Sequence, residues 1–341
     1  MATSRLQGRK VLFIGGTGKI SSACSRRAAE LGADLHLLNR NTTSIRPAPE
    51  GATLITADIR DTDQVRTALK GQEFDVVVDF LGFTTDHVAQ AVGLFGGRTG
   101  QYVFISSAST YQKPLARLPL VEDAPLHNAH SAYARNKIAC EELLARAHDE
   151  QRFPVTVVRP SHTYDRTLFP IPLSGGGYTV VDRMRRGKEV MVHGDGTSLW
   201  TVTHHTDFAL GFTGLLGNPA AVGETFHLTG DEVLSWDAIY RTVAEAAGVD
   251  EPRLVHVPSD AIAAADPARG EEFLGDKAHS MVFDNTKVRR VVPEFTPSIP
   301  FAQGAREIVA WYDEDPARRV VDARLDAFMD RLIDAYRPRP S

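Results

Sequence analysis

A tyrosine and a lysine, Tyr133 and Lys137, stand four residues apart in the segment YARNK, just before the apolar run IACEELL. On a helix, two residues at this spacing lie on the same face about one turn apart. They could carry out acid–base chemistry, because an ammonium group close to a phenol favours the phenolate and lowers its pKa. Ordinary solvated helix faces show the same spacing, so the surrounding elements have to decide between the two interpretations.

Short apolar runs alternate with helical patterns through the first half of the 341-residue chain. Strands are expected at 10–15, 35–39, 53–58, 75–82, 101–107 and 155–160, and the helix that carries Tyr133 lies between the last two. Apolar runs without polar alternation, separated by helices, are typical of a parallel sheet buried on both faces. The sequence therefore predicts an α/β fold, a doubly wound parallel Rossmann sheet with right-handed crossovers.

This alternation breaks after residue 165. We expect helices at 180–187, 236–248, 300–315 and 318–336, and strand-like runs at 189–196, which ends in a turn, and 252–257. Residues 199–230 return to the earlier pattern. The expected organisation is a dinucleotide-binding Rossmann domain over 1–168, joined by 199–230, and a smaller, partly interleaved C-terminal α/β substrate lobe formed by 169–198 and 231–341.

The composition is that of a soluble globular protein, with 43% apolar and 24% charged residues and a net charge of −5. No basic stripe indicates a nucleic-acid partner, and no apolar run is long enough to cross a membrane. Cys24 and Cys140 are expected to be buried thiols, since no disulfide framework is present. The first strand begins within ten residues, which leaves no room for a signal peptide, so a cytoplasmic location is expected.

A glycine turn joins the first strand to the first helix in VLFIGGTGKISS. Gly15 permits the tight turn, and Gly18 lets the backbone approach a pyrophosphate at the helix N-terminus. Thr17, Lys19 and Ile20 complete the expected phosphate loop. Ser21 stands where a third glycine usually follows. Any tight turn needs glycine, but the position at the first strand of a βαβ unit favours a dinucleotide site.

The second strand ends in LLNRN, 24 residues after Gly15, where an NAD site would favour an acidic residue. Asn39 is uncharged and Arg40 is cationic, which favours NADP over NAD; the alternative is a solvated arginine. Asp58 and Ile59 follow the third strand and are expected near the adenine, although Asp58 could instead cap the next helix.

Taken in order, GGTGKIS, FISSASTY, YARNK and VRPSHTY resemble the extended short-chain dehydrogenase/reductase superfamily, and within it the NAD-dependent epimerase/dehydratase family. The resemblance covers essentially the whole chain, although the C-terminal lobe is similar mainly in layout. VVDFLGF is similar to the family's fourth strand, so Phe80, Leu81 and Gly82 are expected to pass the nicotinamide ribose. Residues 275–295 resemble the tails of bacterial epimerase-like members.

This resemblance implies that Ser107, Tyr133 and Lys137 are catalytic: Tyr133 as base, Ser107 on the substrate oxygen, and Lys137 on the phenolate and the nicotinamide ribose. Ser106 is expected to face the other way, because side chains alternate along a strand. Pro160 and His162 follow the sixth strand and are expected beside the cofactor. The candidates for substrate contact are Ser107, Ser109, His162 and Trp200, with core packing as the alternative for Trp200.

Two departures from the family pattern bear on the reaction. The segment SASTYQ lacks the acidic pair that dehydratases carry after the active-site serine, and Trp200 stands near the position of the diphosphate-binding arginine of nucleotide-sugar epimerases. An epimerase acting on a sugar, nucleoside or nucleotide-sugar-like substrate is therefore expected. The alternatives are an NADP-dependent reductase or dehydrogenase and, third, a non-catalytic RNA-binding member, which the acidic chain disfavours.

The remaining polar clusters predict no further site. His204 and His205 are adjacent and would face opposite ways on a strand, so no metal is expected. Arg183, Arg185 and Arg186 are expected to be mostly solvated on a surface helix. The apolar stripe of IACEELLARA, on the helix through which family members pair, predicts a homodimer, with packing on the sheet as the alternative.

Overall fold

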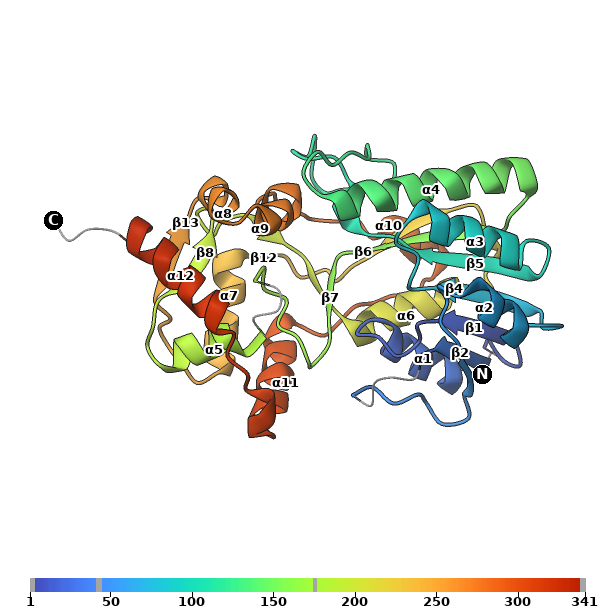
Figure 1. Cartoon of the computed structure of the whole chain (residues 1–341), viewed down its shortest axis with the longest axis horizontal. Helices are drawn as coiled ribbons and strands as arrows, with labels where there is room; N and C mark the ends of the chain where they lie inside the picture. The colour runs from blue at the N-terminus through green and yellow to red at the C-terminus, as the bar shows by residue number, and fades with distance from the viewer. Residues whose placement is uncertain (1–3, 41–44, 174–176, 338–341) are drawn as a thin grey trace.

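The computed structural model describes residues 4–40, 45–173 and 177–337 (Figure 1). Seven parallel strands form the main sheet in the order β11-β6-β5-β4-β1-β2-β3, which confirms the predicted Rossmann architecture. Their bounds are β1 (Lys10–Ile14), β2 (Asp34–Asn39), β3 (Thr53–Thr56), β4 (Phe74–Asp79), β5 (Thr99–Ile105), β6 (Val155–Pro160) and β11 (Thr225–Leu228). The termini of the expected lobes, 1–3 and 338–341, lie outside the described residues.

Helices cover both faces of this sheet, which explains the absence of polar alternation in its strands. Val76 and Val78 of β4 join the core on one face, whereas Val77 joins the core on the other, and all three are fully buried. The first face is covered by α1 (Ser21–Glu30), α6 (His205–Leu215) and α10 (Thr286–Val291). The second is covered by α2 (Thr62–Ala68), α3 (Thr85–Phe95) and α4 (Ala132–Gln151).

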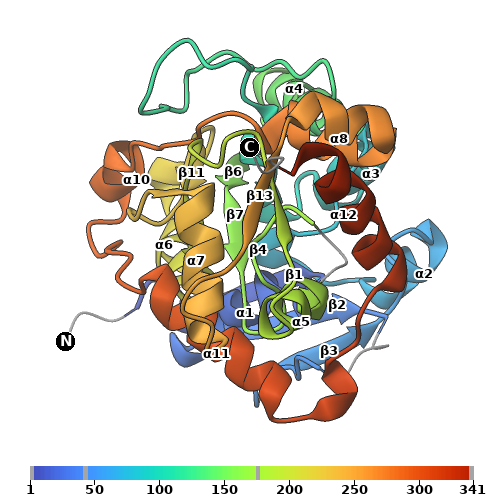
Figure 2. The ribbon, with the colours of Figure 1, turned by 90° about the vertical axis from the view of Figure 1, so that its left-hand side faces the viewer.

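A second lobe lies beyond the carboxyl ends of the strands (Figures 1 and 2). The parallel pair β8 (Val190–His193) and β13 (Leu254–Val257) lies at its centre. The helices of this lobe are α5 (Gly177–Arg185), α7 (Trp236–Ala246), α8 (Ser259–Ala265), α9 (Pro267–Glu272), α11 (Phe301–Asp313) and α12 (Ala323–Tyr336). Short pairs connect the lobes: β7 (His162–Tyr164) with β10 (Val202–His204), and β9 (Leu199–Trp200) with β12 (Leu234–Ser235).

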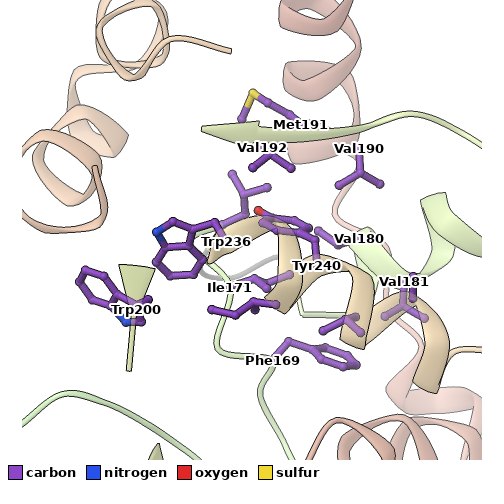
Figure 3. Close-up of a cluster of buried hydrophobic side chains, with 14 of the residues drawn as sticks. Phe169, Ile171, Val180, Val181, Val190, Met191, Val192, Trp200, Trp236 and Tyr240 are labelled. Atoms are coloured by element: carbon purple, nitrogen blue, oxygen red, sulfur yellow. The ribbon is translucent and has the colours of Figure 1, made fainter. Parts of the chain in front are cut away.

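The core of the second lobe is built largely on α7, whose apolar residues follow the helical repeat. Ser235 caps this helix by accepting a hydrogen bond from the Ala238 amide at 3.2 Å. Its buried residues are Trp236, Ile239, Tyr240, Val243 and Ala244. Figure 3 shows Trp236 and Tyr240 of this helix among residues from α5 and β8, with Trp200 at the margin of the cluster beside Trp236.

Several short elements were not predicted from the sequence. They are the helices α8, α9 and α10, the π-helical turn η3 (Phe273–Lys277), and the 3-10 turns η1 (Ala108–Thr110), η2 (Pro219–Ala221) and η4 (Pro316–Arg318). The last helix also begins later than expected, at Ala323, because Asp322 caps it by accepting from the amides of Arg324 and Leu325. Turns of this length give no periodic signal.

The prediction of mostly solvated arginines holds for Arg185 and Arg186, which are exposed, but was wrong for Arg183. Arg183 is 1% exposed, and its guanidinium donates to the carboxylates of Asp326 at 2.5 Å and Asp330 at 2.7 Å on α12. Arg185 makes two hydrogen bonds of 2.7 Å to Asp313. The acidic faces of α11 and α12 pack against α5, so these arginines join helices within the lobe.

The argument from strand alternation at the two adjacent histidines was also wrong. His204 ends β10 and His205 begins α6, so the pair spans a strand–helix junction, and their ring centroids are 4.8 Å apart. His204 contacts Glu307 at 3.1 Å. Within 4–40, 45–173 and 177–337, no group of three or more His, Cys, Asp or Glu side chains could hold a metal, and no helix is apolar over a length that would cross a bilayer.

Candidate active site

The glycine turn after β1 forms a cradle that is closed by Ser21. Gly15 has φ +84°, and a Cβ there would lie 2.8 Å from Cγ of Leu81, so only glycine fits. The Ser21 hydroxyl donates to the Gly15 carbonyl at 2.6 Å and accepts from the Gly18 amide at 2.7 Å. Ser21 therefore replaces the usual third glycine with a side chain that ties the two ends of the turn together.

This cradle fits a dinucleotide pyrophosphate. The helix α1 begins directly behind it, without a side-chain cap and without an acidic residue in its first turn. The N-terminus of a ten-residue helix therefore faces the turn and favours an anion. Lys19 adds a positive charge at the same place and lines the pocket in front of the turn.

A pocket of about 640 Å³ runs from the glycine turn to the second lobe. It gathers most of the predicted site residues, namely Gly15, Gly18, Lys19, Ile20, Phe80, Leu81, Ser107, Ser109, Tyr133, Lys137, Pro160, His162 and Trp200. Thr17, Asn39, Arg40, Asp58, Ile59 and Gly82 lie outside its lining. Five of these six belong to the turn, to the end of β2 or to the segment after β3, on the side where an adenine half would lie.

Lys137 of α4 is buried at the floor of this pocket, 1% exposed. Its ammonium donates to the carbonyls of Gly82 and Ile105, each at 2.6 Å. Burial lowers the pKa of Lys137 to about 8, although the nearby carboxylate of Asp79 opposes this shift. An ammonium has three N–H groups, so one is left for a ligand above it.

Tyr133 and Ser107 face each other across the pocket. Ser131 caps α4 by accepting from the Ala134 amide at 3.2 Å, which sets the first turn that carries Tyr133. Ser107 ends the strand run of β5, and its hydroxyl lies 2.9 Å from that of Ser109. The expected lowering of the Tyr133 pKa involves both Lys137 and an oxidised nicotinamide, and in the protein alone the pKa is not lowered. Burial raises the Tyr133 pKa, and a hydrogen bond from Ser107 only partly opposes this.

The neighbouring serine has a different role, as strand alternation predicted. Ser106 is 1% exposed, and its hydroxyl donates to the carboxylate of Glu141, one turn beyond Lys137 on α4. Arg159 of β6 donates to both oxygens of the same carboxylate, at 3.1 and 2.6 Å. This buried network joins α4 to the ends of β5 and β6, so it fixes the helix that carries Tyr133 relative to Ser107.

His162 and Trp200 lie at the far end of the pocket, toward the second lobe. Burial lowers the pKa of His162 to about 3, so its ring is neutral at physiological pH, and its Nδ1 has no hydrogen-bond partner among the described residues. Trp200 is 2% exposed and packs against Trp236 with ring centroids 5.2 Å apart. Trp200 therefore fills the core, and it also lines the pocket, so that contact with a substrate stays a prediction.

Sequence reasoning missed three charged residues at this end of the pocket. Asp276 and Lys277 of η3 line it, and Lys277 Nζ lies 4.5 Å from the centroid of the Trp200 ring. Lys113 contacts Asp276 at 3.3 Å, and its side chain is only 3% exposed. The only available signal was the segment GDK within a tail similar to epimerase-like members, since a π-helical turn has no sequence period of its own.

On the adenine side, one alternative from the sequence was wrong. Asp58 does not cap α2. Asp61 does, by accepting from the amides of Asp63 and Gln64, while Asp58 accepts from the Arg60 amide at 2.9 Å. Arg40, directly after β2, is exposed. Both cysteines are free and buried, as predicted.

Comparison with known proteins supports the same class of site. A profile described as the NAD dependent epimerase/dehydratase family matches residues 11–94 and 84–228. The chain is 26% identical over 260 residues to the chloroplast stem-loop binding protein of 41 kDa b of Arabidopsis thaliana, covering 73% of this chain and 66% of that protein. It is 29% identical over 161 residues to a UDP-glucose 4-epimerase of Streptomyces lividans, covering 41% and 48%.

These alignments span about half to two thirds of the two relatives. A likeness of fold extends further. The epimerase Mth375 of Methanothermobacter thermautotrophicus superposes with a TM-score of 0.74 over 92% of this chain and 95% of that one, at 17% sequence identity. The architecture of both lobes therefore occurs in known structures, although an identity this low carries information on fold alone.

Proposed function

Because the chain belongs to the NAD-dependent epimerase/dehydratase family, we propose that it is an NAD(P)-dependent epimerase of the extended short-chain dehydrogenase type. It inverts a secondary hydroxyl of a sugar, nucleoside or nucleotide-sugar-like substrate by transient oxidation. The observation that carries the proposal is that Ser107, Tyr133 and Lys137 meet in the pocket that begins at the glycine turn. An ordinary solvated helix face would not bury Lys137 to 1% exposure beside two backbone carbonyls.

The residues of the chain divide the chemistry among them. Tyr133, as phenolate, takes the proton from the substrate hydroxyl, and Ser107 donates a hydrogen bond to the same oxygen, which fixes the reacting carbon. Lys137 holds the ribose beside the nicotinamide with its remaining N–H. A bound nicotinamide would supply reversible hydride transfer at the substrate carbon that Ser107 and Tyr133 position. Tyr133 then returns the proton to the substrate oxygen.

The local charges explain how Tyr133 becomes a base. In the protein alone, burial keeps its pKa above the ordinary value for tyrosine. An oxidised nicotinamide ring carries a positive charge, and a positive charge close to the phenol favours the phenolate. We infer that Tyr133 is activated when the oxidised cofactor is present, so that proton removal is linked to a filled cofactor site.

The charge state of Asp276 favours epimerisation over dehydration, in addition to the absence of an acidic pair after Ser107. Removal of a hydroxyl as water needs a protonated acid, and Asp276 is one of the carboxyl groups that line the pocket. Burial would raise its pKa, but the ammonium groups of Lys277 and Lys113 outweigh burial and lower it. Asp276 is therefore ionised and has no proton to give.

We expect NADP as the preferred cofactor, with NAD as the alternative, because Asn39 and the exposed Arg40 end β2 where an acidic residue would select NAD. We also expect a homodimer and a cytoplasmic location. The Arabidopsis relative is named for binding a stem-loop, but a net charge of −5 disfavours a phosphate backbone, so RNA binding is not proposed.

Incubation with UDP-glucose tests the proposal, followed by separation of the C4 epimers and mass spectrometry of the cofactor retained by the protein. An epimerase should produce the second epimer without net consumption of cofactor. Stoichiometric conversion of free NADPH would instead establish the reductase. If neither reaction occurs with a panel of nucleotide sugars, sugars and nucleosides, while the protein shifts a stem-loop RNA in a gel, the enzymatic proposal fails.

A further inference from the structure

Three polar atoms around the second-lobe end of the pocket have no hydrogen-bond partner among the described residues. They are Nδ1 of His162, Nε1 of Trp200 and Oδ1 of Asp276. Each belongs to a residue that lines the pocket, and Trp200 is 98% buried, since its exposure is 2%. Oδ1 of Asp276 is in ion-pair contact with Lys113 at 3.3 Å, so the unpaired groups are Nε1 of Trp200 and Nδ1 of His162. Buried polar groups are nearly always hydrogen-bonded in folded proteins, so these two groups beside one pocket indicate a polar ligand.

The types of these atoms restrict the ligand. The indole N–H of Trp200 can only donate, and a carboxylate oxygen of Asp276 can only accept. A phosphate or carboxylate would satisfy the indole, but an ionised anion has no proton to donate to the carboxylate of Asp276. A hydroxyl group both donates and accepts, so neighbouring hydroxyls on one ring satisfy both kinds of atom.

Asp276 is held ready to accept hydrogen bonds. Lys277 donates to its Oδ2 at 2.5 Å, and Lys113 lies 3.3 Å from Oδ1 without an aligned hydrogen bond. Lys113 is itself fixed, because its ammonium donates to the carbonyls of Ser109 and Tyr111 at 3.1 and 3.2 Å. Two ammonium groups thus keep the carboxylate ionised and restrict its movement, while Oδ1 keeps lone pairs for a ligand.

Asn128 fixes the position of this carboxylate relative to Ser107 and Tyr133. The Asn128 amide donates to the carbonyl of Gly275, next to Asp276, at 2.7 Å and to the carbonyl of Ser109 at 3.0 Å. Its oxygen accepts from the amide of Ser131, the N-cap of α4, at 2.9 Å. One buried side chain therefore joins the turn that carries Asp276, the turn after Ser107, and the helix that carries Tyr133.

We propose that Asp276, aligned by Lys113 and Lys277, is a specificity-determining residue that accepts hydrogen bonds from neighbouring hydroxyl groups of the substrate ring, with Trp200 as the facing donor. A π-helical turn such as η3 is a frequent place for such residues. The assignment rests on the proposed function in one respect, namely that the ligand is the substrate on which Tyr133 acts. Its chemical class is a polyhydroxylated ring with an uncharged end at Asp276.

Calorimetric binding of UDP-glucose and of UDP tests the assignment, because UDP lacks the sugar ring and has a free terminal phosphate in its place. The protein used is the Tyr133→Phe variant saturated with the oxidised dinucleotide that it binds, so the result does not depend on whether Tyr133 is the base. On this background, Asp276→Asn should weaken UDP-glucose about tenfold and leave UDP unchanged, because a hydrogen bond to a charged group is lost. Trp200→Phe, which keeps an aromatic ring, should weaken UDP-glucose about threefold.

Glu271→Gln is the matched control. Glu271 also lines the pocket, but it is exposed and accepts from the Ala132 amide at 3.2 Å, a contact that glutamine can keep. This variant should leave the affinity for both probes unchanged. If Asp276→Asn does not fold, as shown by loss of dinucleotide binding, the proposal is tested by Trp200→Phe alone. Unchanged UDP-glucose affinity in that variant would then contradict the proposal.

Three results would overturn the proposal. One is a parent protein that binds UDP-glucose no tighter than UDP, or does not bind it at all. Another is an equal change for both probes in the Asp276 variant. The third is tighter binding of UDP by that variant, which would mean that the carboxylate repels an anion and does not accept hydrogen bonds from hydroxyl groups. The proposed function fails separately, through absence of epimerisation in the protein with Tyr133 intact.

Discussion

The ammonium of Lys137 lies over the ring of Tyr133, 5.8 Å from its centroid, although the two residues are one helical turn apart on α4. Its hydrogen bonds go to the carbonyls of Gly82 and Ile105. Lys137 therefore joins the ends of the fourth and fifth strands. For the proposed function we expect the phenol to be activated by Ser107 and by the charge of the oxidised cofactor. Predictions about the three residues consequently differ.

Replacement of Tyr133 by Phe should abolish turnover and preserve folding, since only the hydroxyl is lost. Loss of a general base costs about a hundredfold to ten-thousandfold in rate. Single-turnover reduction of bound cofactor by an active sugar is the measurement.

Ser107→Ala should slow the same step and leave dinucleotide affinity nearly intact. Ser106→Ala is a comparison: it removes a hydrogen bond to Glu141 in the network that positions α4, so it should lower stability and slow the step less than Ser107→Ala does. Near-normal reduction by the Phe variant would return YARNK to an ordinary helix face.

Dinucleotide binding should weaken as the pH rises through about 8, the value to which burial lowers the Lys137 pKa. The sign follows from the ligand: an anionic dinucleotide and its ribose favour the protonated ammonium, so affinity is highest below this pH and falls above it. Titrations of the wild type between pH 6.5 and 9.5 should show the decline, with those limits taken about 1.5 units either side of that pKa. Lys137→Met should bind more weakly and lack the inflection. An unchanged inflection in that variant would assign it to another group.

Replacement of Arg40 by Ala should weaken NADP more than NAD. A charge-assisted contact to the extra phosphate suggests a difference of about 1.5 to 3 kcal/mol between the two cofactors. Fluorescence titration of both dinucleotides measures it. A suitable control is Arg66→Ala, which removes an exposed arginine whose ion pair is with Asp63 on α2. Equal losses for both dinucleotides would contradict the preference for NADP.

The Ser21 hydroxyl should matter for cofactor binding although it touches only the protein. Ser21→Ala removes the hydrogen bonds to Gly15 and Gly18, each worth about 0.5 to 1.5 kcal/mol. The turn should loosen, the melting temperature should fall, and dinucleotide affinity should drop about threefold to thirtyfold. Ser21→Gly restores the usual glycine without the hydroxyl and should behave like the Ala variant. Wild-type affinity in both variants would show that the turn is rigid without Ser21.

Homodimer formation remains a prediction. Cys140, Leu144 and Ala147 of the apolar stripe on α4 are buried within the chain, whereas Ile138 and Leu143 are only partly covered. A dimer through α3 and α4 would cover these last two. Light scattering at micromolar concentration should give about twice the mass of 37.3 kDa. A single-chain mass would leave only the packing interpretation.

The sequence determines the sheet better than the site, for physical reasons. Strands such as β4 are buried on both faces, so apolar runs mark them clearly, and α7 shows its buried side through helical spacing. The placement of Ser107 and Tyr133 follows from where β5 ends and α4 begins. The cluster of Lys113, Asp276 and Lys277 could not be predicted from the sequence. Lys113 contacts Asp276 across a sequence separation of 163 residues, and these residues lie on turns without periodicity.

Errors in the sequence interpretation have one common origin. The helix pattern alone predicts that Arg183 is solvated, but two aspartates of α12 form ion pairs with its guanidinium. His204 and His205 read as strand neighbours, but a helix begins between them. In each case an element distant in the sequence, or the start of a new one, decides where a polar side chain points.

The position of β11 has a consequence for exchanging parts between related proteins. The chain enters the second lobe through β7 and returns to add β11 beside β6 before it leaves again. A chimera that kept residues up to Tyr164 and took everything after it from a protein of another architecture would expose β6, with Val157 and Val158, as a bare sheet edge. Such edges recruit other chains and aggregate. A chimera designed to change substrate specificity should therefore keep α6 and β11 together with the sheet. The segments of the second lobe before and after them should be replaced separately.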